Sequence, residues 1–107
     1  MIENKFDIIT VQKYKEDFDK LFYMVNDLLY GIGPEKIDKE DFEVLMSSFE
    51  NVVRLSSMYN NIVQQVIKDK EIVTEDPQEY IGNNLTNACN LTQSIYRKYK
   101  HLSQFDK

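Results

Sequence analysis

The sequence predicts an all-α fold, an antiparallel three-helix bundle formed by a single domain over residues 1–107. Three long stretches place apolar residues at steps of three and four, which is the period of a helix and not of a strand. Short connections separate the stretches and so favour antiparallel neighbours. Glycine and proline are rare, at 3 and 2 residues, and a chain of this length supports one modest core.

The first predicted helix spans about residues 10–30. Thr10 offers an N-cap hydroxyl, and Gly31 followed by Pro34 ends the pattern, since proline cannot continue a helix. Asp27 is expected on the solvated side. The apolar seam consists of Val11, Tyr14, Phe18, Leu21, Val25 and Leu28, reinforced by Phe22 and Leu29.

The second predicted helix, about 38–70, carries two apolar stripes. The expected core seam is Phe42, Leu45, Phe49, Val52, Tyr59, Val63 and Val66. The second stripe, rotated away from the first, is Val44, Leu55, Met58 and Ile62. A helix that is apolar over most of its circumference must be covered on more than one side, so this helix is predicted to be the central one.

The third predicted helix spans about residues 76–104. Its start combines Asp76 as N-cap, Pro77 at the first helical position and Glu79 in the first turn. Its seam is Ile81, Leu85, Ala88, Thr92, Ile95, Tyr99 and Leu102. The small residues in the middle of this seam would let two helix backbones approach closely.

Charge supports the antiparallel arrangement and disfavours nucleic acid. The net charge of −5 has the wrong sign for binding a phosphate backbone. Antiparallel packing brings the basic end of the third helix, around Lys98, near an acidic region at the start of the second. We expect this acidic patch to dock a basic partner. Its residues are Glu35, Asp38, Glu40, Asp41 and Glu43.

No residue pattern points to catalysis, a metal or a cofactor. His101, the single histidine, has no partners at metal-ligand spacing, and Cys89, the single cysteine, has no neighbouring pattern that would activate it. We therefore expect a protein that is not an enzyme and has no cofactor. Neither a membrane-spanning run nor a secretory leader is evident, so a cytoplasmic location is expected.

A candidate protein interface lies where the middles of the second and third helices meet. Between Ile81 and Tyr96 the third helix carries no charged residue, and the cores of interfaces are depleted of charge. A plain solvent-exposed face explains the same pattern equally well, and a small-molecule groove explains it less well. The predicted interface residues are Leu55, Met58, Ile62, Asn83, Asn87, Asn90 and Ser94.

These observations predict a small protein-binding module whose partner is another protein, itself included as a homodimer. The abundance of lysine over arginine suggests an AT-rich genome, and we expect a regulatory or inhibitory protein of phage or low-GC bacterial origin. The alternative is a helical chaperone or secretion-associated protein that covers a partner helix. Salt separates the two, because electrostatic docking weakens with ionic strength and apolar docking does not. An enzyme or nucleic-acid binder is a distant third.

Overall fold

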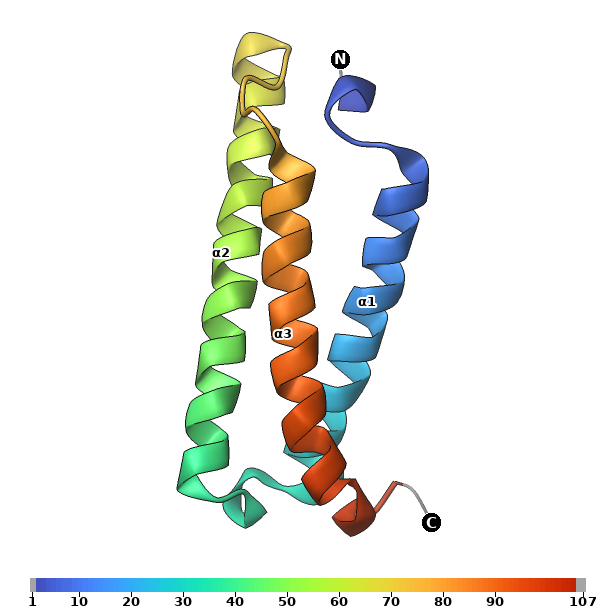
Figure 1. The fold of residues 1–107 in the computed structure, drawn as a ribbon, viewed down its shortest axis with the longest axis vertical. Helices are drawn as coiled ribbons and strands as arrows, with labels where there is room; N and C mark the ends of the chain where they lie inside the picture. Colours follow the sequence, from blue (N-terminus) through green and yellow to red (C-terminus); the bar gives the residue numbers. More distant parts are fainter. Residues whose placement is uncertain (1, 106–107) are drawn as a thin grey trace.

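A computed structural model describes residues 2–105, over which the chain forms three α-helices and no strand. The helices are α1 (Ile8–Asn26), α2 (Lys39–Asp69) and α3 (Pro77–Tyr99). They lie side by side and alternate in direction, in a molecule that measures 48 × 25 × 19 Å (Figure 1). The predicted all-α antiparallel three-helix bundle is confirmed.

Short helical turns shorten the first and third predicted helices. The turns are η1 (Ile2–Asn4), η2 (Asp27–Ile32), η3 (Pro34–Lys36) and η4 (Lys100–Leu102). After α1 the chain widens into the π-helical turn η2, and after α3 it tightens into the 3-10 turn η4. The positive φ of 101° that releases the chain from η2 belongs to Gly33, not to Gly31.

Local capping sets the helix starts. Asp7, and not the predicted Thr10, caps α1: its carboxylate accepts a hydrogen bond of 2.8 Å from the Thr10 amide. At α3 the predicted signals are confirmed, because Asp76 accepts from the Glu79 amide at 3.2 Å and Pro77 begins the helix. At the end of α2, Lys70 adopts the left-handed conformation with φ 62°.

The most completely covered helix is α3. It packs closely against both α1 and α2 along its length and lies between them in Figure 1. Direct contact between α1 and α2 is made by side chains, such as the Phe18 and Tyr59 rings with centroids 6.4 Å apart. So α2 touches both other helices, but the seam of α3 forms the centre of the core. Its buried residues are Ile81, Leu85, Ala88, Thr92, Ile95 and Tyr99.

The two predicted stripes of α2 exchange roles. The residues of α2 buried against α3 are spaced seven apart: Asp41, Ser48, Leu55 and Ile62. Much of the predicted core seam is open instead, with Phe42 exposed by 46% and Phe49 by 58%. The assignment of these phenylalanines to the core was therefore wrong, and Leu55 and Ile62, expected at the surface, are core residues exposed by only 1% and 4%.

Two polar residues explain the exchange. Asp41 and Ser48 occupy the buried face of α2, where a hydrophobic pattern does not look for them. Both are satisfied: Asp41 by Lys98 and Tyr99, and Ser48 by Thr92 and Ala88. A buried polar group that is fully hydrogen-bonded carries little penalty. The buried heptad of α2 is consequently half polar and half apolar.

Candidate functional site

An almost wholly apolar groove lies between α1 and α2, here named the α1/α2 groove, with a volume of about 490 Å³. One wall, here called the α1 wall, is the stripe Phe18, Phe22 and Val25 of α1, continued by Leu29 of η2. The other wall is the α2 stripe Phe42, Leu45, Met46, Phe49 and Val52. Both stripes step by three and four, so each is one continuous helix face.

The floor of the groove is the contact between α2 and α3. Ser48 Oγ and Thr92 Oγ1 lie 2.7 Å apart, and Ser48 Oγ donates to the carbonyl of Ala88 at 2.9 Å. Both hydroxyls are thus hydrogen-bonded within the protein, so the floor offers no free polar group to a ligand. No charged residue lines the groove. Its surface can therefore recognise only an apolar shape.

The walls expose large apolar side chains. Phe22 of α1 is 72% exposed and Phe49 of α2 is 58% exposed, and both line the groove. Two i,i+4 ion pairs lie on the outer faces of the helices, Lys15 with Asp19 at 2.9 Å and Glu50 with Arg54 at 3.4 Å. A contiguous apolar patch of this kind is uncommon on a monomer.

A second hollow, of about 570 Å³, lies between α1 and α3 on the opposite flank. Its lining includes both acidic and basic residues: Asp17, Asp19, Lys20, Arg97 and Lys100. Cys89 also lines it, and its thiol donates to the carbonyl of Asp17 at 3.6 Å. Burial, followed by the nearby Asp17, raises the pKa of the Cys89 thiol, which disfavours a nucleophilic role.

Asp27 forms a buried polar cluster that the sequence did not reveal. It was expected in solvent, yet its side chain is only 2% exposed. It accepts hydrogen bonds of 2.5 Å from both Tyr96 Oη and Ser103 Oγ. Burial, reinforced by the bond to Asp27, raises the pKa of Tyr96 far above its usual value, so this phenol stays a donor. The cluster ties η2, α3 and the C-terminal segment together.

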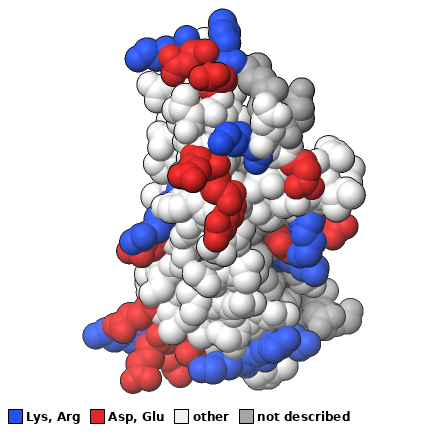
Figure 2. Space-filling view, turned by 45° about the horizontal axis from the view of Figure 1, so that its top comes forward, with Lys and Arg blue, Asp and Glu red and all other residues white. Residues whose placement is uncertain are grey.

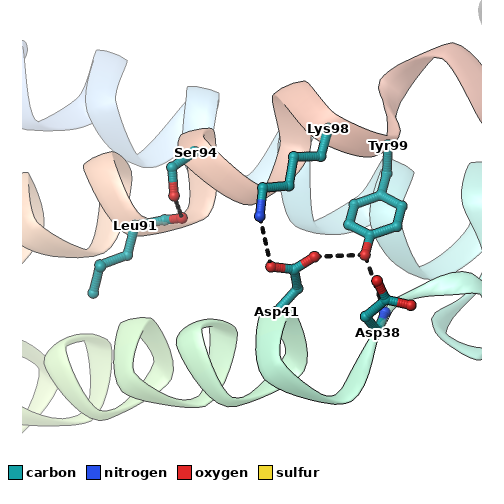
Figure 3. A network of polar contacts seen from close by, with 6 residues as sticks. All are labelled: Asp38, Asp41, Leu91, Ser94, Lys98 and Tyr99. Atoms are coloured by element: carbon teal, nitrogen blue, oxygen red, sulfur yellow. Dashed lines mark hydrogen bonds and ion pairs between the residues drawn. The ribbon is translucent and has the colours of Figure 1, made fainter.

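The acidic patch is only partly available to a partner. Asp41 accepts from Tyr99 Oη at 2.6 Å and from Lys98 Nζ at 2.9 Å, while Tyr99 Oη also accepts from the Asp38 amide at 3.0 Å (Figure 3). The bond from Tyr99, followed by that from Lys98, lowers the pKa of Asp41. The predicted approach of Lys98 to the patch is thereby confirmed, but the Asp41 carboxylate is occupied.

The remaining members of the patch are exposed, namely Glu35, Asp38, Glu40 and Glu43. Acidic side chains gather at one corner of the lower end of the molecule in Figure 2, next to a row of basic ones. Docking of a basic partner on this patch remains a prediction.

The predicted interface on α2 and α3 divides into two groups. Leu55 and Ile62 are core and Met58 is half-buried, so the prediction that these three form an exposed apolar stripe was wrong. On α3 the polar members are exposed as expected: Asn83, Asn87, Asn90 and Ser94. Figure 2 shows a broad uncharged area on this side of the molecule, and Ser94 turns its hydroxyl back to the Leu91 carbonyl at 2.8 Å (Figure 3). A binding role for these four residues stays a prediction.

Within residues 2–105 no group of three or more His, Cys, Asp or Glu side chains is arranged to hold a metal ion. Of the helices in the same range, none has the length and apolarity needed to cross a membrane. Comparisons with protein-family models, curated proteins and solved structures found no match.

Proposed function

We propose that this protein is a protein-binding module whose α1/α2 groove takes an amphipathic helix. The observation that carries the proposal is the pair of apolar walls, each a helix face with three-four spacing, left open above a floor with no free polar group. Docking of an amphipathic helix into an apolar groove is a recurrent mode of protein recognition.

The dimensions suit a helix of about three turns. The α1 wall runs from Phe18 to Leu29, which corresponds to about 17 Å at 1.5 Å per residue. A helix lying between α1 and α2 would add a fourth member to the bundle, at the usual interaxial distance of about 8–10 Å. Its apolar residues, at positions i, i+3, i+4 and i+7, would meet Phe22 on one side and Phe49 on the other.

The composition of the groove favours the class of protein that covers a partner helix over an electrostatic inhibitor. Because no charged residue lines the groove, affinity should change little with ionic strength. The second candidate is the regulatory or inhibitory role, supported by the exposed carboxylates Glu35, Glu40 and Glu43, and its binding should weaken steeply with salt.

Site-specific photo-cross-linking tests the proposal. A photoreactive phenylalanine analogue is placed at Phe49 in the groove or, as control, at Ser47, which is also exposed on α2 but points about 200° away. The cross-linked peptides are then identified after irradiation in cell extract. We expect position 49 alone to yield peptides with helical three-four apolar spacing, at both low and high salt. Equal yields from both positions, or no peptide from position 49, would contradict the proposal.

A further inference from the structure

We infer that the helix in the α1/α2 groove is α1 of a second copy of this chain, so that two copies form a two-fold symmetric dimer. This inference rests on the proposed function, because it uses the same groove. It names the occupant and the residues that insert: Phe22 of each copy enters the groove of the other copy, between the α1 and α2 walls.

Symmetry supports this occupant. A two-fold interface needs a patch that is complementary to itself. In the α1/α2 groove the two walls are antiparallel stripes of similar length and the same apolar character. A two-fold axis parallel to the helices places α1 of each copy against α2 of the other, again antiparallel. Phe22, the most exposed aromatic residue of the walls at 72%, then becomes the knob that each copy supplies.

The exposed apolar area is also sufficient. Phe22, Phe42 and Phe49 are exposed by 72%, 46% and 58%, which leaves about 300–400 Å² of aromatic surface in water at 150–250 Å² for a whole side chain. Val25, Leu29 and Met46 are exposed by 39%, 46% and 50% and add to it. A specific interface needs about 500 Å² from each partner, and these six residues supply most of that.

The distribution of charge also favours a second copy of this chain as the occupant of the groove. Each copy carries a net charge of −5, so association must occur on a surface without acidic residues. The groove lining meets this condition, because it contains no charged residue. The lining offers a foreign helix no charged group that would fix its direction. A second copy brings its own fixed orientation through symmetry.

Sedimentation of the full chain tests the inference. Across a range of about 1 to about 200 µM, the wild-type mass should rise from 12.7 kDa toward twice that value. Phe22→Glu should weaken the dimer by at least about 100-fold, because two buried carboxylates face an apolar wall. The matched control is Val73→Glu, which changes an apolar side chain 63% exposed in the connection between α2 and α3, outside the groove. It should leave the dissociation constant unchanged.

A wild-type chain that remains monomeric overturns the inference, while cross-linking at Phe49 to a helix of another protein would still support the proposed function. A dimer that survives Phe22→Glu uses another face and overturns it equally. If Phe22→Glu loses its helical circular dichroism, Phe42→Glu, at the end of the opposite wall, takes its place with the same expected loss.

Discussion

The hydroxyl oxygens of Ser48 on α2 and Thr92 on α3 lie 2.7 Å apart in the buried interior. Ser48 also donates to the Ala88 carbonyl at 2.9 Å, so the α2/α3 contact is made by small residues with satisfied hydroxyls. This pair sets which face of α2 is buried. The adjacent face, with Phe42 and Phe49, is turned toward the open groove as a result.

Truncation of a core residue should lower the free energy of unfolding much more than truncation of a groove residue. Leu55→Ala removes a side chain that is 1% exposed and should lower the free energy of unfolding by about 2–5 kcal/mol. Phe49→Ala removes a ring that is 58% exposed and should cost about 1 kcal/mol or less in the dilute, monomeric chain. Urea denaturation of both variants measures the difference. A larger loss from Phe49→Ala would show that its face of α2 is the core.

Gly31 is required by space and not by a left-handed backbone. A Cβ atom at this position would overlap Asp27 Oδ1 and would lie 2.8 Å from Ser103 Oγ and 2.9 Å from the Phe105 ring. Gly31→Ala should therefore destabilise the fold by about 1–3 kcal/mol through overpacking. It should also loosen the C-terminal segment, which is held by the bond from the Gln104 amide to the Gly31 carbonyl at 2.9 Å. Thermal melting and limited proteolysis measure the two effects, and a neutral or stabilised variant would be contrary to this packing.

Acid should weaken the fold through Asp41. Its pKa is lowered in the folded state by the bonds from Tyr99 and Lys98. The stabilisation is therefore fully present above the unfolded pKa of about 3.9 and is lost as the pH falls through the folded value. Asp41→Asn should flatten the loss of unfolding free energy below about pH 4. Part of this pH dependence should remain in the variant, because the pKa of Asp7 is also lowered in the folded chain.

The control for this titration is Glu43→Gln, which changes an exposed carboxylate two residues away on the same helix. Denaturant unfolding at several pH values between about 2 and about 6 measures the free energy of unfolding over the range in which Asp41 titrates. An acid slope in Asp41→Asn equal to that of the wild type would show that the Lys98–Asp41–Tyr99 contacts do not stabilise the fold.

Cys89 should react slowly with thiol reagents. Burial raises the pKa of its thiol, and the Sγ atom donates to the Asp17 carbonyl, so little thiolate is present at neutral pH. Alkylation with iodoacetamide should be at least about tenfold slower in the folded chain than in the chain unfolded by denaturant. Equal rates would mean that the contact between α1 and α3 at Cys89 opens freely.

Helix periodicity and turn residues sufficed to predict the three helices and their antiparallel order. The seam residues of α3 at positions 81, 85, 88, 92, 95 and 99 are buried as the pattern predicts. Antiparallel packing also placed Lys98 correctly beside Asp41. These features depend on local propensity and spacing, which the sequence contains directly.

The buried face of α2 could not be predicted in the same way. It contains Asp41 and Ser48, whose partners lie on another helix and are known only after packing. The face with more aromatic residues was therefore taken as core, and the groove was missed. The signal was nevertheless present in the sequence. The first two helices carry more large apolar residues than three helices of this length can cover, among them Phe22, Leu29, Phe42 and Phe49.

The most direct test of the α1/α2 groove as the binding surface is an isotope-filtered nuclear Overhauser experiment on a mixture of labelled and unlabelled chains. The dimer predicts contacts between copies from the Phe22 ring to the side chains of Met46 and Phe49. Contacts between copies that involve Asn83, Asn87 and Asn90 instead, or none at a concentration at which the chain sediments as a dimer, would contradict it.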